Sequence, residues 1–515
     1  MLLKSRYYVI AATHTMYQLY YNRIIKPCDM KNCVFAMLSV LIITGCSKSS
    51  DTPGNGGGNP PPIDNPPGPN DVQITSVNLT YGYTNNVIQI TGKNFGTDKT
   101  ALVVKVNNAV AAIINSVITD TDFSIKVPAK CGTGTITVTK AGKTAVGPQF
   151  YYIPSVTVTT LYGKADVGNY VNGTGTNMRM NTPVDFAFDK NDNLYVVERG
   201  GILGAPPGSM ITKITASTGQ KSTFSGGPLN GNVPNNTNVT WTVGLPGNVS
   251  SSVNGGDARY NLANGIVIST DPNSNAFKLF VTQNNFVRVV NEATATGVFA
   301  GNPKDTLGGG GSPKEGGRHE AHIFPLSNPV IFPNGTDYGS PTLYWLDAGP
   351  RIVKQDINGN ISTLVDLTGV AGGGFLAEHP DGSIYLHTTI TQKIVRLTST
   401  GAISTWINTT DSVLNRASGK KELFSTQVDA APTRAFDIDK DGNVFFVNIS
   451  SLYTTLYKFF PDKSFLRLFQ WHNDYTYTDG VNDQADMAGP IKIIVRNNGD
   501  IYCIDGYAIR KMTFE

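Results

Sequence analysis

The amino-acid sequence predicts an all-β protein in which a small β-sandwich precedes a six-bladed β-propeller, closed into a ring by the propeller's own N-terminal strand. Three observations lead to this fold class. The 515 residues include 54 glycines and many short stretches of alternating apolar and polar residues, and helical periodicity is not sustained beyond the extreme N-terminus. Residues 71–154 have the strand and turn spacing of a sandwich. Residues 155–515 repeat one pattern of strands six times.

The charged residues are balanced, with 41 basic and 38 acidic residues and no long run of Lys or Arg. A protein that binds nucleic acid, or a membrane through a polybasic patch, carries a basic excess. The composition therefore argues against both, and we expect no nucleic-acid partner. The hydrophobic fraction of 40% is sufficient for two folded domains.

Residues 1–45 form the predicted signal-peptide region. The apolar run VFAMLSVLII at 34–43 follows Lys31 and is too short to span a bilayer comfortably. Because Met30 directly precedes Lys31, it makes a more typical signal-peptide start than Met1. We therefore expect translation to begin at Met30.

The motif ITGC, which ends at Cys46, follows this run and resembles a bacterial lipobox, in which a peptidase cuts before the Cys and lipid is attached to it. The alternative is an ordinary buried Cys beside an apolar run. Residues 46–70 are rich in Pro, Gly, Ser and Asn and predict a disordered tether, which favours the lipobox. Each buried acyl CH₂ contributes about 0.8 kcal/mol, so two or three chains on Cys46 would hold the protein on the membrane. We expect a surface-exposed outer-membrane lipoprotein of the cell envelope.

The segment 71–154 predicts a β-sandwich, because short apolar and polar alternations are separated by turn residues. It resembles the IPT/TIG immunoglobulin-like domain in the stretch ITGKNFG at 90–96, in Val127-Pro128 and in the closing FYY at 150–152. The resemblance implies a spacer or interaction module without catalysis.

One strand pair recurs along residues 155–515. The clearest copy is VDFAFDKNDNLYVVE from residue 184, and a third strand and usually a fourth strand follow each pair. The last copy lacks a fourth strand, and residues 158–163 carry the missing pattern ahead of the first copy. Pairing of this strand with the last copy would close the ring and remove a free sheet edge. Each third strand carries a base, which we expect to act within its own blade rather than in an anion-binding ring; these are Lys213, Arg288, Lys354, Arg396, Lys458 and Lys511.

The loops that lead into the first strands, such as YVNGTGTNMRMNTP at 170–183 and YTDGVNDQADMAGP at 477–490, extend the repeat. Together with the strand pairs they resemble NHL repeats over essentially all of 155–515. The resemblance implies a six-bladed propeller. Insertions at 226–256 and 301–318 depart from the usual repeat length, so no ligand position is carried over from the family.

Propellers usually bind ligands on the face formed by the loops that lead into the first strands and by those between the second and third strands. Aromatic rings, amides and a few charges on this face suit a polar ligand with planar faces, such as a sugar. The alternative is that each side chain only packs or solvates its loop. The candidate ligand-binding residues are Arg179, Arg199, Asn284, Asn285, His319, His322, Asp347, Trp471, His472, Tyr475, Tyr477 and Asp505.

No metal, cofactor or catalytic residue is expected. His319 and His322 have a weak metal-like spacing, but a zinc site needs three or four converging ligands. Some NHL-type propellers are zinc lyases with histidines from several blades; here His379 falls in a turn on the opposite face and His387 ends a strand. The sequence also contains no nucleophile elbow or activated Cys motif.

The stretch FDIDKDGNVFFVN at 436–448 begins like an EF-hand calcium loop. Asn448 stands at the twelfth position, where that loop needs a bidentate acid, and the flanking residues predict strands rather than helices. Gly442 suits the left-handed position of a tight hairpin. We therefore expect a turn.

These observations favour a lipid-anchored, non-enzymatic binding protein of the cell envelope, with a polysaccharide or an envelope protein as its partner. One alternative is an enzyme that works in the propeller channel, a lyase or hydrolase, with or without a metal. Another is a structural component of an envelope complex.

Overall fold

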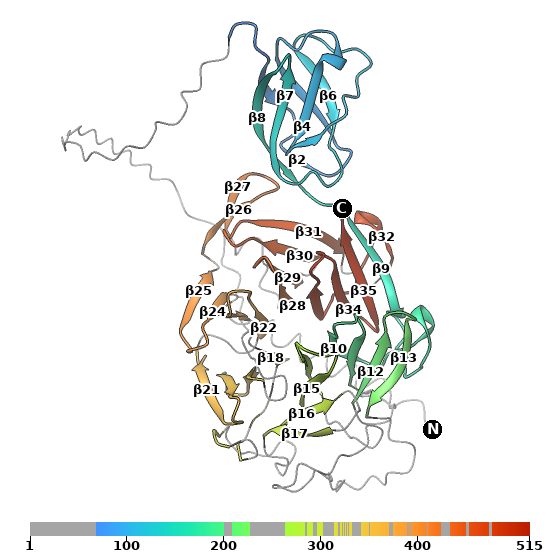
Figure 1. Ribbon diagram of the computed structural model, residues 1–515, viewed down its shortest axis with the longest axis vertical. Helices are drawn as coiled ribbons and strands as arrows, with labels where there is room; N and C mark the ends of the chain where they lie inside the picture. The colour runs from blue at the N-terminus through green and yellow to red at the C-terminus, as the bar shows by residue number, and fades with distance from the viewer. Residues whose placement is uncertain are drawn as a thin grey trace, which may run out of the picture. The chain divides into compact units, whose positions relative to one another are not determined.

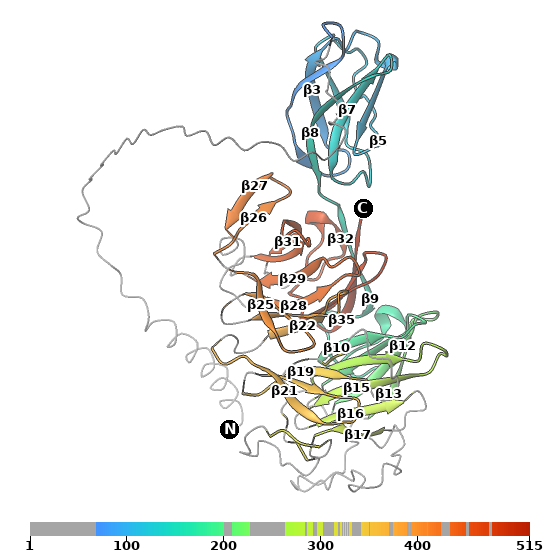
Figure 2. The ribbon, with the colours of Figure 1, turned by 60° about the vertical axis from the view of Figure 1, so that its left-hand side comes forward.

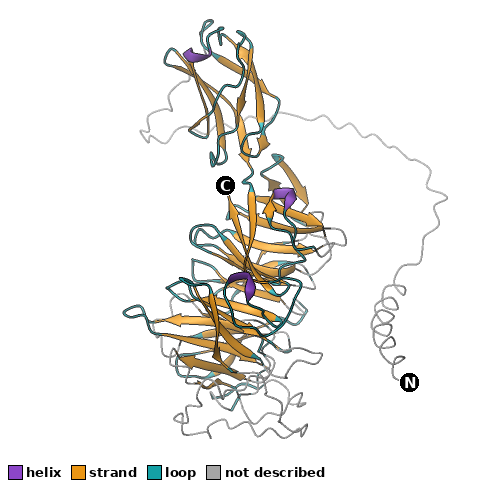
Figure 3. Ribbon diagram, turned by 90° about the vertical axis from the view of Figure 1, so that its right-hand side faces the viewer, coloured by secondary structure: helices purple, strands orange, loops and turns teal. Residues whose placement is uncertain are grey.

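The computed structural model describes most of the sandwich and of the propeller (Figures 1 and 2). The residues described are 68–199, 209–226, 263–283, 286–291, 296–301, 314–317, 320, 321, 323, 325, 327, 329–331, 341–349, 351–369, 374–388, 391, 393–408, 410–423, 433–449, 453–472 and 476–515. Strands dominate these residues, and the few helical segments are single 3₁₀ turns (Figure 3). No helix among them is long and apolar enough to cross a membrane.

The sandwich consists of two sheets that enclose one core. Strand β3 alternates strictly between exposed and buried residues, as expected for a strand with one face on a core. Ile90, Phe95 and Phe123 are fully buried, and the two phenyl rings meet edge to face at 4.9 Å. One sheet contains β1 (Gln73–Val77), β3 (Val87–Lys93) and β6 (Asp122–Lys126); the other contains β2 (Tyr81–Gly82), β8 (Lys143–Tyr152), β7 (Gly134–Lys140), β4 (Leu102–Val106) and β5 (Ala109–Val110), and η1 (Lys99–Ala101) precedes β4.

The rest of the described chain forms six blades, each built on four antiparallel strands arranged outward from the ring centre. Blade 1 contains β10 (Pro183–Phe188), β11 (Leu194–Glu198), β12 (Met210–Thr215) and β13 (Gln220–Ser225). Blade 2 contains β14 (Gly265–Thr270), β15 (Phe277–Gln283), β16 (Phe286–Asn291) and β17 (Thr296–Ala300). Blade 3 contains β18 (Val330–Ile331), β19 (Leu343–Asp347), β20 (Arg351–Gln355) and β21 (Ile361–Asp366).

Blade 4 also has four strands, whereas blades 5 and 6 have additional ones. Blade 4 contains β22 (Gly374–Glu378), β23 (Ile384–Thr388), β24 (Ile394–Leu397) and β25 (Ile403–Ile407). Blade 5 contains β28 (Thr433–Ile438), β29 (Val444–Ile449), β30 (Tyr453–Phe459) and β31 (Phe465–His472), and its outer edge is extended by β26 (Ser412–Asn415) and β27 (Lys420–Leu423). Blade 6 contains β33 (Lys492–Val495), β34 (Ile501–Asp505), β35 (Ala508–Phe514), β9 (Val156–Gly163) and β32 (Gly480–Val481). The helical turns η2 (Gly175–Asn177) and η4 (Asn482–Gln484) lie in the loops before β10 and β33.

The first strands of successive blades contact one another around the ring, and β10 of blade 1 contacts β33 of blade 6. In Figure 1 the colour passes from green through yellow and orange to red around this ring. The second strands are buried on both faces, because each blade packs against a neighbour on either side; all five residues of β11, for example, are buried. The predicted all-β class, with a sandwich and a six-bladed propeller, is confirmed.

Strand β9 closes the ring as predicted. It pairs antiparallel with β35 from Val156 to Gly163, and its other edge pairs with β32. The backbone N–H of Thr160 also donates to the Asp479 carboxylate at 2.8 Å, across 319 residues of sequence. The closing strand therefore has a neighbour on both sides at Thr157 and Val158, and the Asp479 carboxylate covers the N–H of Thr160 just beyond them.

The third-strand bases act within their own blades. In five blades the base lies directly opposite an aromatic residue of the second strand, and in four of them its charged group lies over that ring. Such cation–π contacts cover the ring while the charged group stays near water. The prediction of a local role is confirmed for these pairs: Tyr195 and Lys213, Tyr344 and Lys354, Tyr385 and Arg396, Phe445 and Lys458, and Tyr502 and Lys511.

The acidic stretch at 436–448 forms a hairpin, as predicted. Asp439 accepts the backbone N–H groups of Asp441 and Asn443 at 3.0 and 2.8 Å, and Gly442 has a φ of 76°. Asp437 instead accepts the N–H of Val495 in blade 6 at 2.7 Å. The carboxylates therefore point in different directions and do not form a calcium loop.

Carboxylates satisfy N–H groups on the inner edge of the ring, where the first strands lack a further strand to pair with. Lys492 of β33 lies 3.1 Å from one of these carboxylates, that of Asp185. Such bonds join neighbouring blades, because acid and N–H belong to adjacent first strands. The pairs are Asp185 with Ile266, Glu378 with Ile331 and Asp437 with Val495.

Glu378 makes stability depend on pH. Burial, with a smaller contribution from the nearby Asp437, raises the pKa of its carboxyl from 4.5 to about 8, although the hydrogen bond from the Ile331 N–H opposes the rise. The folded protein thus holds a proton that the unfolded chain has released, so the stabilisation is complete at low pH and is lost as the pH rises toward 8. Glu378→Gln keeps an acceptor for the Ile331 N–H and cannot ionise. Urea unfolding at pH 9 should show the variant about 2 kcal/mol more stable than the wild type.

The exposed Glu320 provides the control for this experiment. Glu320→Gln should leave the free energy of unfolding and its pH dependence unchanged. A Glu378→Gln variant with the same pH dependence as the wild type would contradict the assignment.

Candidate functional site

Several residues chosen from the sequence lie outside the described part of the chain, so their role stays a prediction. This group contains the lipid-attachment residue, four of the five histidine and asparagine candidates and one tyrosine: Cys46, Asn284, Asn285, His319, His322 and Tyr475.

Asp347 and Asp505 end the second strands of blades 3 and 6, and both are completely buried. Asp347 forms an ion pair with Arg351 at 2.8 Å. Asp505 accepts the backbone N–H groups of Ala488 and Gly489, both at 3.1 Å, and so fixes the loop that leads into β33. In the structure both acids hold the blade together and face no open surface.

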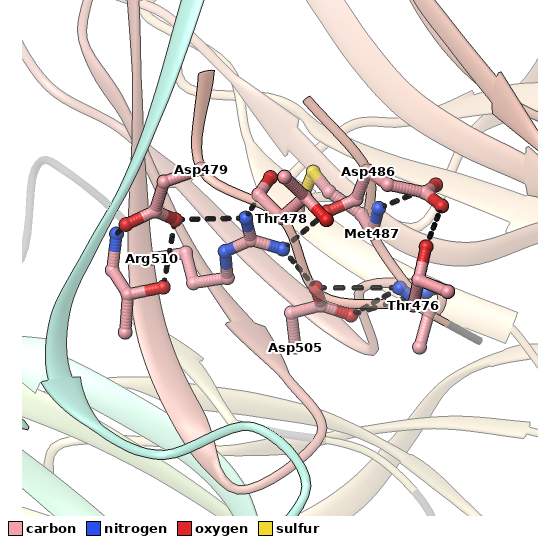
Figure 4. A network of polar contacts seen from close by, with 10 residues as sticks. Thr476, Thr478, Asp479, Asp486, Met487, Asp505 and Arg510 are labelled. Atoms are coloured by element: carbon pink, nitrogen blue, oxygen red, sulfur yellow. Dashed lines mark hydrogen bonds and ion pairs between the residues drawn. The ribbon is translucent and has the colours of Figure 1, made fainter. Parts of the chain in front are cut away.

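Arg510 is the partner of Asp505 and connects the parts of blade 6 (Figure 4). Its guanidinium is fully buried and lies 2.9 Å from the carboxylates of both Asp505 and Asp479. It also donates to the carbonyl oxygens of Thr478 and Asp486 at 2.8 and 2.6 Å. Because Asp479 in turn bonds the closing strand β9, one side chain fixes both the loop and the closure.

Blade 1 has an equivalent ion pair that the sequence reasoning missed. Glu198 ends β11, is fully buried, and lies 2.7 Å from the Lys221 ammonium. It also accepts the N–H of Asn181 and the hydroxyl of Thr212, each at 2.7 Å. Burial raises the pKa of Glu198, and the Lys221 charge opposes this. An acid stands at the last position of the second strand in three of the six copies, and this recurrence in the sequence could have pointed to the buried ion pairs.

The two arginine candidates stabilise loops. Arg179 donates to the carbonyl oxygens of Thr176 and Met178 at 2.7 and 2.6 Å, within its own loop. Arg199 donates to the side chain of Asn264, which joins blade 1 to blade 2, and burial lowers the pKa of Arg199.

The remaining candidates lie apart from these residues. Trp471 is buried and packs against Phe469 at 4.9 Å, whereas His472 is exposed beside Tyr453 at 4.7 Å. Tyr477 lines a separate polar hollow of about 560 Å³, together with residues of the loop after β9. The structure therefore does not bring the described candidates together into one site.

A cleft that was not predicted lies where blade 6 meets blade 1, on the face formed by the turns between first and second strands. This is the face opposite to the one chosen from the sequence. We call it the seam cleft, since it lies at the junction that β9 closes. Its volume is about 400 Å³, within the usual range for small-ligand sites. Its lining residues are Tyr162, Phe188, Asp192, Leu194, Ala216, Arg496, Asn497, Asn498 and Tyr502.

Aromatic rings and one ion pair shape the seam cleft. Phe188 and Tyr502 meet edge to face at 5.0 Å, and the Arg496 guanidinium lies over the Phe188 ring at 4.2 Å. Arg496 also pairs with Asp192 of blade 1, so the pair spans the seam. Burial, and secondarily Tyr502, raise the pKa of Tyr162, which keeps its hydroxyl protonated at neutral pH.

Tyr502 differs from its counterparts in the other blades. Tyr195, Tyr344, Tyr385 and Phe445 occupy the same position opposite the third-strand base, and all four are buried. Tyr502 is only half-buried and forms part of the wall of the cleft. At this position the Tyr502 ring therefore packs against Phe188 of blade 1 and also presents part of its surface to the cleft.

The seam cleft offers an ion pair, amides, phenol groups and rings, which are groups capable of hydrogen bonding and stacking. Within the described residues, no group of three or more His, Cys, Asp and Glu side chains is arranged to hold a metal ion.

Comparison with known families concerns the sandwich. Residues 73–152 match the IPT/TIG domain. The resemblance seen in the sequence is thereby confirmed for this part of the chain. No curated protein matches the sequence.

Solved structures resemble the chain at low sequence identity. A structural genomics protein of unknown function from Bacteroides thetaiotaomicron has a TM-score of 0.48 and 16% identity, over 87% of this chain and 100% of that one. An auxiliary nutrient binding protein from the same organism has a TM-score of 0.43 and 13% identity, over 86% and 98%. Virginiamycin B lyase from Staphylococcus aureus, in a catalytically inactive form, has a TM-score of 0.39 and 12% identity, over 70% and 99%.

Proposed function

We propose that the protein is a non-enzymatic, carbohydrate-binding lipoprotein of the cell envelope. The seam cleft holds the saccharide, the IPT/TIG domain serves as a spacer, and the lipid on Cys46 anchors the chain. The observation that supports carbohydrate binding most directly is Tyr502, the one aromatic residue among the five equivalent positions that is not buried and that lines a cleft.

The chemistry of the lining supports this ligand class. A sugar ring presents an apolar face of C–H groups and an edge of hydroxyls. Tyr502 and Tyr162 supply aromatic surface with polar ends, and Arg496, Asp192 and Asn497 supply hydrogen-bond donors and acceptors at the same place. A few polar groups among rings are typical of sites that orient a small polar ligand.

Replacement of Tyr502 by alanine should weaken polysaccharide binding about tenfold, because it removes a ring that excludes water from the bound sugar. A glycan-array screen of the purified full-length protein identifies the ligand, and affinity gel electrophoresis with that polysaccharide measures the loss. Asn497→Ala should also weaken binding, without loss of stability, because this side chain is exposed.

Tyr453 provides the matched control, because it is 37% exposed and lies in blade 5 outside the seam cleft. Tyr453→Ala should leave binding unchanged. The proposal fails if the wild-type protein binds no polysaccharide, or if neither cleft substitution weakens binding.

A further inference from the structure

The distribution of charge in and beside the seam cleft restricts which saccharides fit. Arg496 is the cation that lines the cleft, and its guanidinium pairs with the Asp192 carboxylate across the seam. Lys511, whose ammonium lies 5.7 Å from the centre of the Tyr502 ring, pairs with Asp500 at 2.7 Å. Both of these positive charges thus have a carboxylate partner, and the two pairs carry no net charge.

An anionic sugar would have to compete with these carboxylates. Its acid group would lose water and meet Asp192 as a like charge beside the guanidinium, which disfavours binding. A neutral sugar meets no such repulsion. Its adjacent hydroxyls can accept from the guanidinium and donate to the carboxylate, and both of these groups are already held by each other.

The surrounding polar groups are also neutral and pre-oriented. The Asn498 side chain donates to the Asp500 carboxylate at 2.8 Å and accepts the Asp500 N–H at 3.1 Å, which fixes its amide. The Tyr162 hydroxyl stays protonated, since burial raises its pKa. Such groups can both donate and accept, as hydroxyl-rich ligands require.

From this geometry we infer that the seam cleft is specific for neutral saccharides, and that Asp192 is the residue that excludes acidic ones. The inference rests on the proposed function, because it specifies the ligand class of the same cleft. Removal of the Asp192 charge leaves the Arg496 guanidinium without its carboxylate, at the wall of an aromatic cleft, where it can pair with a uronate.

Asp192→Asn tests this specificity with little disturbance of the backbone. Asp192 has a φ of 61° in the turn between β10 and β11, a conformation that Asn tolerates well. The matched control is Asp441→Asn, an equally exposed acid in the corresponding turn of blade 5. It changes the net charge by the same amount on the same face of the ring.

The experiment is affinity gel electrophoresis of the full-length protein at low salt, against a panel of neutral glucans, mannan, galactan and xylan, and against polygalacturonate. The wild type should be retarded by a neutral polysaccharide and not by polygalacturonate. Asp192→Asn should gain binding to polygalacturonate by about fivefold over Asp441→Asn, and higher salt should remove this gain.

The outcomes separate the two proposals. Retardation of the wild type by polygalacturonate but by no neutral polysaccharide would overturn the neutral specificity and leave carbohydrate binding intact. Binding to neutral polysaccharide with no gain for Asp192→Asn over Asp441→Asn would overturn the role of Asp192. No retardation by any polysaccharide would overturn carbohydrate binding itself.

Discussion

Replacement of Arg510 by alanine is expected to lower the free energy of unfolding by about 3–5 kcal/mol, the usual cost of removing one partner from a buried ion pair. Asp505 is completely buried and would lose the guanidinium that compensates its charge. The carbonyl oxygens of Thr478 and Asp486 would lose their donor as well. Urea unfolding at neutral pH, followed by tryptophan fluorescence, measures the difference.

Arg396 provides the control, since it pairs with Asp381 at 2.8 Å, against 2.9 Å for Arg510 and Asp505, but with 40% of its side chain exposed. Arg396→Ala should cost less than about 1 kcal/mol, because water solvates the acid that remains. Equal losses for the two variants would show that the Arg510 network does not hold blade 6 together.

Thr159→Pro should destabilise the propeller by about 3 kcal/mol or more. The N–H of Thr160 points toward Asp479, and successive N–H groups point to opposite sides of a strand, so the N–H of Thr159 points toward β35. Proline removes this donor in the middle of the closing strand and puts a ring in its place. The loss is measured by the same urea unfolding.

The side chain of Thr159 is exposed, so Thr159→Ala separates the backbone effect from the side-chain effect. The alanine variant should lose no more than about 1 kcal/mol, through the lower strand propensity of alanine. If the proline variant were as stable as the alanine variant, the closure by β9 would contribute little to stability.

The fold could be predicted from the sequence because each blade is specified locally. Each copy, such as VDFAFDKNDNLYVVE, combines alternating apolar residues with a turn that contains an acid or a glycine, and this combination predicts a strand pair. The last copy lacks its fourth strand, which pointed to residues 158–163 as the strand that completes it. The sandwich was also recognisable from one contiguous stretch. These features depend on neighbours in sequence, which a reader of the sequence can see.

The site could not be predicted in the same way. Asp347 and Asp505 were selected as polar residues at loop ends, yet each is buried against an arginine. Tyr502 has the same position in the repeat as Tyr195, and nothing in either copy shows that only one of them faces a cleft. Exposure at the seam depends on how blades 1 and 6 pack, and Asp192 and Arg496 meet across 304 residues of sequence.

The closure by β9 also determines when the seam cleft forms during folding. Tyr162 comes from β9 at the N-terminal end of the propeller, whereas Arg496 and Tyr502 come from its C-terminal end, so the cleft needs pairing between the two ends. Contacts of such long range form late, because a long loop must close before they stabilise the chain. A propeller with five complete blades would have a core but no seam cleft. Ligand binding would then report on completed folding, and a bound saccharide would favour the closed ring over the open one by mass action.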